Sequence, residues 1–460
     1  MELKNKKILV IGAGRSGLAV TAFLAGKGAR VTLTDIKGAD KLGDTGEGLP
    51  RGAELCLGNY PRVTGGSFDL LVVSPGVPLT VEPVAAARDL GIPVMGELEL
   101  AFQFSKAPFV AITGTNGKTT TTSLVGEIFR DAGFKTLVAG NIGLPLVTGV
   151  EQYIPEDIVV AEVSSFQLET TAGFRPRVGV ILNITPDHLD RHGSMTAYIA
   201  AKARVFVNQD QGDYTVLNYD DPETRALEGL SPGKVIFFSR RHILEEGVFV
   251  QDGNITAAIN GKIIPVLPAA ELQIPGAHNL ENALAAVACA LVLGVAPESL
   301  ANTLRKFSGV AHRLEPVTEI NGVKYVNDSK GTNPDASIKA LEAFDQPIVL
   351  IAGGKNKGND FAVFASKVRE RARVLVVLGQ CAAELEAAAK KAGCTTVLRA
   401  GAFPEAVELA RQAARPGEIV LLSPACASWD MFNSYEERGD LFKELVRQWA
   451  GQENCLLGKA

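Results

Sequence analysis

Short, continuously apolar segments alternate with helical stretches at the start of the chain. Such runs are typical of strands buried on both faces of a parallel sheet. A glycine-rich turn at residues 12–17 joins the first run to a helical stretch, which is the pattern of a βαβ unit. The strands predicted here are residues 7–11, 30–35, 69–76 and 92–96.

The same alternation continues in the middle of the chain, where an apolar run at residues 108–112 precedes a helical pattern at 121–129. Residues 247–266 differ: the pairs Asp252-Gly253 and Asn260-Gly261 are typical of hairpin turns and predict a small antiparallel extension. A predicted helix at 279–293 closes this part. Further strands are predicted at residues 157–162, 177–183, 214–218 and 234–238.

The last third repeats the pattern, with strands predicted at residues 323–327, 347–351, 373–377 and 418–422. We therefore predict an α/β protein of three domains, a number that suits 460 residues. They are a Rossmann-like N-terminal domain (1–105), a central mononucleotide-binding domain of the P-loop type (106–309) and a C-terminal Rossmann-like α/β domain (310–460).

Composition narrows the functional classes. The net charge of −5 argues against a broad nucleic-acid-binding face. The apolar runs are short, and the N-terminus has no secretory apolar region, so we expect no membrane insertion. The six cysteines are scattered without a C-x-x-C pair, which indicates a reducing compartment and neither disulfides nor a zinc site. We expect a cytoplasmic monomer.

The strongest chemical signal is the segment Gly114-Thr-Asn-Gly-Lys-Thr-Thr120, which lies between a predicted strand and a predicted helix. Its backbone N–H groups and the helix N-terminus can bind phosphates, Lys118 can reach the outer phosphates, and the hydroxyl of Thr119 can bind Mg²⁺. The first glycine of the full P-loop pattern would fall at Ile112. The alternative is a plain turn leading into a helix.

A second phosphate-binding pattern, Gly12-x-Gly14-x-x-Gly17 followed by Asp35, is the dinucleotide fingerprint. Alone it is a weak signal that also fits other phosphate-bearing ligands or tight packing. An NAD enzyme has no need of the phosphate loop at residues 114–120. A chain with both patterns is expected to hold a nucleotide-linked substrate in one site and ATP in the other.

Metal-binding groups follow two central strands. Glu162 ends an apolar strand, where a carboxylate faces the ligand crevice and can bind Mg²⁺ beside Thr119. Asp187 and His188 are the candidates in the polar segment 183–192, for which a structural turn is the alternative. Spacing alone does not select Lys202, because a lysine with apolar neighbours usually extends to solvent. We expect His192, His242 and His278 to be structural.

Three polar loops follow strands of the last domain, at residues 327–333, 353–358 and 423–428. Any one of them could be a plain turn. Together they suggest a site for a small anionic substrate. Arg313 precedes them and could stabilise a transferring phosphoryl group. Cys426 has no histidine near it in sequence, and we interpret it as a small packed residue.

As an ordered set, these motifs resemble the Mur ligase family of peptidoglycan synthesis, and most of all its D-glutamate-adding branch. The resemblance runs from about Lys7 to about Phe442. It implies three domains that bind, in order, a UDP-sugar, ATP and an amino acid. The motifs that carry it are residues 114–120, 140–143, 162–168, 278–283, 312–313, 327–330 and 423–428.

The resemblance also implies site residues. Ile36 and Lys37 depart from the usual polar-plus-arginine pair of the family, and Tyr435 stands where a Phe is also found. The residues implied to bind the UDP-sugar are Arg15, Ser16, Asp35, Ile36, Lys37, Ser74, Asn141, Gln167 and His188. The residues implied to bind ATP are Gly114, Thr115, Asn116, Gly117, Lys118, Thr119, Thr120, Asn279, Asn282, Arg313 and Asp328. D-glutamate is expected to bind to Lys330, Thr332, Lys357, Ser428 and Tyr435, and two Mg²⁺ ions to Thr119, Glu162, His188 and a carbamylated Lys202.

The implied reaction is ATP-driven amide formation, with Lys118, His188, Lys202 and Arg313 as catalytic residues. The substrate UDP-N-acetylmuramoyl-L-alanine would be activated as an acyl phosphate and then attacked by D-glutamate. Two anions must meet in such a reaction, so Mg²⁺ ions and cationic side chains are needed to neutralise charge.

Other functions stay open at this point. An NAD-dependent oxidoreductase explains residues 12–35 but gives no role to Lys118, Glu162 or Arg313. A sister ligase that adds another amino acid is closer to the family resemblance than the oxidoreductase. The candidates are the L-alanine-adding enzyme, the diamino-acid-adding enzyme and a folate polyglutamate ligase. The folate enzyme lacks the first-domain fingerprint, and the Asp-Asn-Pro-Arg of the diamino-acid enzyme is absent from the sequence. A non-catalytic nucleotide-binding protein leaves the candidate catalytic groups unused.

Overall fold

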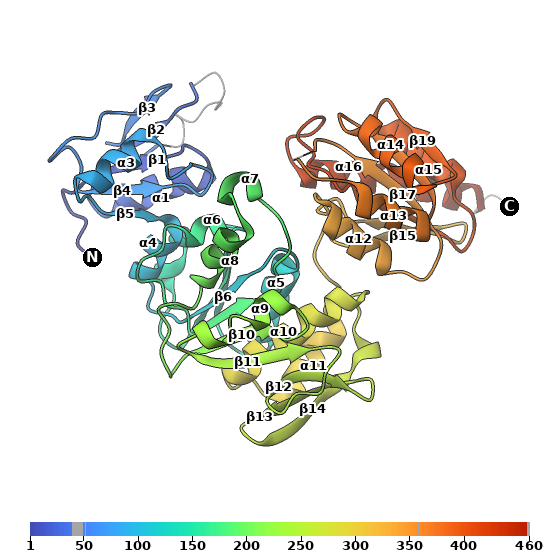
Figure 1. Cartoon of the computed structure of the whole chain (residues 1–460), viewed down its shortest axis with the longest axis horizontal. Helices are drawn as coiled ribbons and strands as arrows, with labels where there is room; N and C mark the ends of the chain where they lie inside the picture. The colour runs from blue at the N-terminus through green and yellow to red at the C-terminus, as the bar shows by residue number, and fades with distance from the viewer. Residues whose placement is uncertain (39–48, 51, 357, 458–460) are drawn as a thin grey trace. The chain divides into compact units, whose positions relative to one another are not determined.

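The computed structural model describes residues 1–38, 49–50, 52–356 and 358–457. The chain forms two compact units, Met1–Glu271 with Glu281–Arg305 and Leu272–Leu280 with Lys306–Ala460. The first unit contains two sheets and the second contains one, and helices pack against each sheet (Figure 1). The predicted α/β class with three domains is confirmed. Among the described residues, no helix is long and apolar enough to cross a membrane.

The first sheet has five parallel strands in the order β3-β2-β1-β4-β5, with the strand order expected of a Rossmann-like domain. Strand β3 was not predicted, because its residues are only partly buried and give no continuous apolar run. The elements are β1 (Lys7–Ile11), α1 (Arg15–Gly26), β2 (Arg30–Asp35), β3 (Glu54–Leu57), β4 (Leu70–Val73), α3 (Glu82–Asp89), β5 (Val94–Gly96) and α4 (Glu97–Phe104).

The second sheet has nine strands in the order β14-β13-β12-β11-β10-β9-β6-β8-β7. It is parallel from β7 to β12, and β12 to β14 form the predicted antiparallel extension. Its two turns, Asp252-Gly253 and Asn260-Gly261, have positive φ at both central residues, as two-residue hairpins require. The strands are β6 (Phe109–Thr113), β7 (Thr136–Gly140), β8 (Ile158–Glu162), β9 (Val178–Ile181), β10 (Tyr214–Asn218), β11 (Lys234–Ser239), β12 (Gly247–Gln251), β13 (Asn254–Ile259) and β14 (Lys262–Pro268).

Helices that connect these strands include a long one, α5, directly after β6. Its continuous buried side, which includes Leu124, Ile128 and Phe129, packs on β7 and β8. The helices are α5 (Lys118–Asp131), η1 (Leu146–Thr148), η2 (Val150–Gln152), α6 (Ser165–Leu168), α7 (Leu189–His192), α8 (Met195–Ala203), α9 (Pro222–Arg225), η3 (Glu228–Leu230), η4 (Ala269–Glu271), α10 (Ala277–Val292) and α11 (Pro297–Lys306).

The third sheet, in the second unit, has six strands in the order β15-β16-β20-β17-β18-β19, and β15 is antiparallel to β16. Both edge strands, β15 and β19, were missed in the sequence because they are half-exposed. The elements are β15 (Glu315–Ile320), β16 (Val323–Asn327), α12 (Pro334–Glu342), β17 (Ile348–Gly353), α13 (Ala362–Arg371), β18 (Ala372–Leu378), α14 (Ala382–Ala392), β19 (Val397–Arg399), α15 (Phe403–Ala413), β20 (Ile419–Leu422) and α16 (Tyr435–Leu457).

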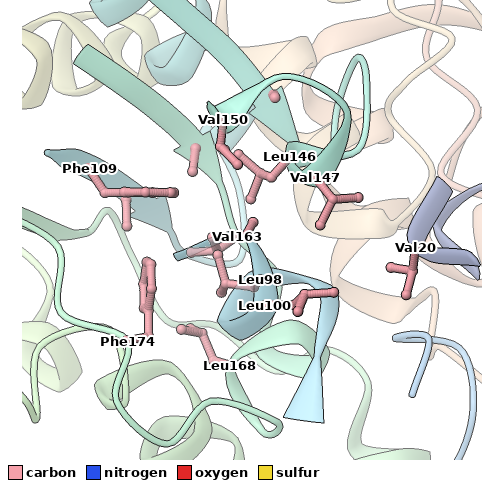
Figure 2. Close-up of a cluster of buried hydrophobic side chains, with 14 of the residues drawn as sticks. Val20, Leu98, Leu100, Phe109, Leu146, Val147, Val150, Val163, Leu168 and Phe174 are labelled. Atoms are coloured by element: carbon pink, nitrogen blue, oxygen red, sulfur yellow. The ribbon is translucent and has the colours of Figure 1, made fainter. Parts of the chain in front are cut away.

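One hydrophobic core joins the two sheets of the first unit (Figure 2). Leu98 and Leu100 of α4 are buried together with Val20 of α1 and Phe109 of β6. Phe102 of α4 meets the ring of Phe109 edge-on at a centroid distance of 5.9 Å. Helix α4 therefore fixes the first sheet to the central one.

Gly17 stands in the first turn of α1, where a side chain has no room. An added Cβ would lie 1.8 Å from the carbonyl oxygen of Gly12. We expect Gly17→Ala to lower the free energy of unfolding by about 1–3 kcal/mol through overpacking. Gly26→Ala, at the end of the same helix and with nothing within 4 Å of its added Cβ, is the matched control. Urea titration of both variants checks this, and an equal effect at the two positions would contradict it.

Glu97 is a buried carboxyl at the start of α4. It accepts a hydrogen bond from the N–H of Val147 at 2.9 Å. Burial raises its pKa to about 7, and the backbone hydrogen bonds only partly oppose the shift. The unfolded chain therefore ionises this group at a lower pH than the folded chain. Rising pH lowers the free energy of unfolding between these two pKa values, by roughly 3 kcal/mol in total.

Glu97→Gln keeps an acceptor oxygen but cannot ionise. We expect this variant to match the wild type closely at about pH 5 and to exceed its stability clearly at about pH 8. Urea unfolding at both pH values measures the difference. Glu82→Gln, at an exposed position of α3, serves as the control. A stability difference that stays constant with pH would refute the assignment.

Candidate active site

The phosphate loop connects β6 to the N-terminus of α5. Gly117 has φ of +85°, and an added Cβ there would lie 2.2 Å from Oδ1 of Asn282, so the loop requires glycine at this position. Nζ of Lys118 donates to the carbonyl oxygens of Gly114 at 2.9 Å and Thr115 at 2.7 Å. The lysine ammonium thus lies over its own loop, beside the positive end of the helix.

Asn183, just beyond the end of β9, holds this loop in its conformation. Its backbone oxygen accepts from the N–H of Thr115 at 2.9 Å. Its side chain pairs with the backbone of Asn116 in both directions, at 2.9 Å and 3.1 Å. The sequence analysis included this residue only as the first position of the polar segment 183–192 and gave it no role. The strand order β9-β6-β8, which places it beside the loop, was the missing information.

Glu162 lies at the end of β8 and is buried. Its Oε2 accepts from the hydroxyl of Thr119 at 2.8 Å, and its Oε1 accepts from Nδ2 of Asn141 at 2.7 Å. A carboxylate and a hydroxyl side by side are the oxygen ligands that Mg²⁺ prefers. The hydroxyl of Thr120 is buried and has no partner among the described residues. These residues fit a bound Mg²⁺–nucleotide.

Lys202 of α8 is buried beneath the same loop. Its Nζ donates to the carbonyl of Gly114 at 2.8 Å and lies 4.5 Å from the ring centroid of Tyr198. Burial, with a smaller contribution from the nearby Lys118, holds the pKa of Lys202 well below its ordinary value. The lowered pKa favours the uncharged amine, which is the form that reacts with CO₂ to give a carbamate.

His188 has a left-handed backbone, with φ of +54°, directly before α7. Its Nε2 lies 3.5 Å from Oδ2 of Asp187, and its ring meets Phe166 edge-on. In the described part of the chain no cluster of three or more His, Cys, Asp and Glu side chains could hold a metal.

A cavity of about 480 Å³ lies between the first sheet and the central sheet of the first unit. Eight residues that the resemblance implied for the UDP-sugar line it, and so does Tyr60, which the sequence did not single out. His188, the ninth residue implied for this ligand, is not among the lining residues. The eight are Arg15, Ser16, Asp35, Ile36, Lys37, Ser74, Asn141 and Gln167.

Asp35 shapes the wall of this cavity. Its two carboxylate oxygens accept from the backbone N–H groups of Ala13 and Lys37, both at 2.9 Å. Ser74 donates to the carbonyl oxygen of Gly12 at 3.1 Å and so closes the glycine turn. Burial and the neighbouring Asp35 raise the pKa of Tyr60, which therefore keeps its phenolic proton. The cavity offers polar groups from the first sheet and amides from the central domain.

The predicted loops of the second unit also converge. Asp328 is buried and accepts from the N–H of Leu314 at 3.2 Å and from the hydroxyl of Ser423 at 2.7 Å. Burial raises its pKa to about 6, against the opposing charge of Arg313. Nε of Arg313 is buried and has no hydrogen-bond partner within the described residues.

Arg438 of α16 is a buried cation that sequence reasoning missed. It donates to the hydroxyl and the carbonyl of Ser329, at 2.9 Å and 2.8 Å, and to the carbonyl of Cys426 at 3.4 Å. Arg438 therefore joins the loop after β16 to the loop after β20. In the same unit, Nζ of Lys330 lies 5.2 Å from the ring centroid of Tyr435.

The remaining predicted residues are distributed as follows. Ser428 is buried in the second unit, and the N–H of Thr332 donates to the carbonyl of Lys330 at 2.9 Å. Asn279 belongs to the second unit, where its Nδ2 donates to the carbonyl of Pro275 at 2.7 Å, whereas Asn282 belongs to the first. Lys357 lies outside the described residues.

Comparison with known proteins places each part of the chain. Residues 6–96 match the profile of the N-terminal domain of MurD-like Mur ligases, residues 112–290 that of the Mur ligase middle domain, and residues 312–426 that of the Mur ligase glutamate ligase domain.

Full-length relatives agree with these profiles. The chain is 63% identical to the UDP-N-acetylmuramoylalanine–D-glutamate ligase of Pelotomaculum thermopropionicum over 97% of its own length and 98% of the relative's. It is 51% identical to the enzyme of that name from Desulfitobacterium hafniense strain Y51, over 97% and 99%.

Solved structures share the fold. The UDP-N-acetylmuramate–alanine ligase MurC of Thermotoga maritima superposes with a TM-score of 0.60 at 20% identity, over 96% of this chain and all of that one. The MurF ligase of Thermotoga maritima, solved in complex with ADP, gives a TM-score of 0.59 at 17% identity, over 97% and 96%.

Proposed function

Since the chain belongs to the Mur ligase family, we propose that it joins D-glutamate to UDP-N-acetylmuramoyl-L-alanine, a step of peptidoglycan precursor synthesis. ATP is cleaved to ADP and phosphate in the reaction. The high identity to full-length relatives that carry this enzyme name supports the choice of amino acid. The alternative functions, an oxidoreductase and a sister ligase, are not favoured.

One contact supports the proposal most directly. Asn141 lines the cavity and also donates to Glu162, which in turn accepts from Thr119 of the phosphate loop. The cavity is thus connected to the phosphate loop through a single amide and a single carboxylate. A UDP-sugar in the cavity could then place its alanyl carboxylate beside the terminal phosphate of ATP. An NAD-dependent oxidoreductase would not require a cavity that is connected to a phosphate loop.

The chemistry follows from this proximity. An oxygen of the alanyl carboxylate attacks the γ-phosphorus of ATP, the bond to the bridging oxygen breaks, and ADP leaves. The acyl phosphate now has a good leaving group, which the carboxylate lacked. The amine of D-glutamate attacks the acyl carbon, loses a proton, and phosphate departs. Lys118 and the N-terminus of α5 stabilise the charge on the transferring phosphoryl group.

Mg²⁺, when bound, would neutralise the phosphate oxygens of ATP. Thr119 and Glu162 would hold one ion, and His188 and a carbamylated Lys202 are the proposed ligands of a second. In the second unit, Lys330, Thr332, Ser428 and Tyr435, together with Lys357, are proposed to bind D-glutamate. Cationic and hydroxyl groups suit its two carboxylates.

The decisive experiment measures phosphate release from ATP with UDP-N-acetylmuramoyl-L-alanine, offering D-glutamate, L-glutamate, L-alanine, L-lysine and meso-diaminopimelate separately. We expect release that requires both the UDP-sugar and D-glutamate. Release with another amino acid would keep the ligase and overturn its specificity. No release from folded protein with any amino acid, together with binding of NAD, would support the oxidoreductase.

Two cavity variants separate binding from positioning. Lys37 lines the cavity just after the end of β2, on the first sheet, so Lys37→Ala should raise KM for the UDP-sugar about 10-fold at nearly constant kcat. Asn141→Ala removes the link to Glu162 and should lower kcat as well, by about 10–100-fold. Steady-state kinetics with varied UDP-sugar measures both. Identical effects of the two variants would argue against the link.

A further inference from the structure

Two cysteines that are far apart in sequence meet in the second unit. Sγ of Cys381, at the N-terminus of α14, lies 3.0 Å from Sγ of Cys426, in the loop after β20. Both residues are buried and both are free thiols. A disulfide has its sulfurs about 2.05 Å apart, so these thiols need to approach by only about 1 Å.

The pair lies where two of the predicted amino-acid-binding loops touch. The N–H of Cys381 donates to the carbonyl of Gly354 at 3.0 Å. Lys355 and Ala427 form an antiparallel bridge, with hydrogen bonds of 2.8 Å and 3.0 Å, directly beside Cys426. Cys381 is therefore joined to the loop after β17 by a backbone hydrogen bond, and Cys426 belongs to the loop that carries Ser428.

The backbones of the two loops pack closely where they meet. A Cβ added at Gly354 would lie 2.2 Å from the carbonyl of Ala427 and 3.3 Å from Cβ of Cys426. The carbonyl of Cys426 is also held by Arg438. Because the backbones of both cysteines are hydrogen-bonded within this junction, we expect part of the displacement of about 1 Å at the sulfurs to pass into the two loops, where small shifts misplace bound reactants.

We propose that Cys381 and Cys426 form an oxidisable dithiol site, and that its disulfide impairs binding of the amino-acid substrate. The consequence for activity rests on the proposed function, whereas the disulfide itself does not. Peroxide is the oxidant class. One thiol sulfur attacks a peroxide oxygen, the O–O bond breaks, and a sulfenic acid and water result. The second sulfur attacks the sulfenic sulfur, the S–O bond breaks, and a second water leaves. Two electrons pass from the thiols to the peroxide.

The roles of the two thiols follow from their surroundings. The hydrogen bond to Cys426 lowers the pKa of Cys381, and the backbone contact with Gly354 adds to this effect. The same hydrogen bond, together with burial, raises the pKa of Cys426. Cys381, at a helix N-terminus, is thus the thiol that attacks first and Cys426 is the one that resolves.

The experiment uses the full-length protein, first reduced and then treated with hydrogen peroxide. Digestion without reductant and mass spectrometry should yield a peptide pair that links Cys381 to Cys426. KM for D-glutamate of the fully linked protein should be at least about 10-fold higher than that of the reduced protein, and dithiothreitol should restore it. Activity of the reduced protein tests the proposed function separately, because the linked peptides are detected whether or not the enzyme is active.

Variants give the matched control. Cys381→Ala should resist peroxide, and Cys381→Ser provides a second version should the alanine variant fold poorly. Cys394→Ala, which removes a half-buried thiol of the same unit, should remain as sensitive as the wild type. Absence of the linked pair from peroxide-treated wild type would overturn the proposal. So would a linked protein with an unchanged KM for D-glutamate.

Discussion

Replacing Lys118 with methionine is expected to lower kcat by about three orders of magnitude or more, the largest effect that we predict for a single substitution. Methionine keeps most of the side-chain volume but removes the ammonium that lies over the phosphate loop, 2.7 Å and 2.9 Å from two loop carbonyls. The charge that develops on the transferring phosphoryl group then has no lysine partner. Single-turnover phosphate release measures the chemical step directly.

Lys135→Met is the control for this substitution, because Lys135 is an exposed lysine that donates to the carbonyl of Gln152, beyond the end of α5. It should leave kcat within about 2-fold of the wild type. If the Lys118→Met protein binds ATP normally and retains its kcat, the phosphate loop has no part in the mechanism.

The second large effect concerns Lys202. Lys202→Met should lower kcat by about 100–1000-fold, since a carbamate on this lysine would be an anionic ligand for Mg²⁺ that methionine cannot replace. The wild type should also lose activity when CO₂ is stripped from the buffer and regain it with bicarbonate. In mass spectra recorded under native conditions, the protein should carry the added mass of one CO₂.

Lys106→Met, at an exposed position, is the matched control and should respond to none of these treatments. Activity that is indifferent to CO₂, combined with an unmodified mass, would exclude the carbamate while leaving the role of Lys202 as a hydrogen-bond donor to Gly114 intact.

Local patterns in the sequence were sufficient where one segment builds one feature. The glycine turn before α1, the phosphate loop before α5 and both hairpin turns were predicted from neighbouring residues, because each depends on backbone geometry within a few positions. Asn183 and Arg438 were not selected, since their partners come from other strands and helices. Arg438 stands among charged residues of α16, and no periodic signal separates this buried cation from its exposed neighbours.

The limits of sequence reasoning also differ between strands. The central strands β6 and β17 are buried throughout, and β1 is buried from Ile8 onward, so all three gave continuous apolar runs. The edge strands β3 and β19 are short and half-exposed, so their polar residues conceal them. Lys202 was found only through the family resemblance, because apolar neighbours on a helix do not show whether a lysine ends in solvent or in a core.

Helix α4 couples the unfolding of the two sheets of the first unit. Its apolar side chains, its phenylalanine contacts and its two buried glutamates attach the first sheet to the central one, and Glu99 alone accepts hydrogen bonds from the N–H groups of three successive residues, Ala172, Gly173 and Phe174. Amide hydrogens of both sheets should therefore exchange through one shared opening reaction rather than two. The walls of the cavity between the two sheets are then assembled when the chain folds, so the proposed UDP-sugar would enter a preorganised site.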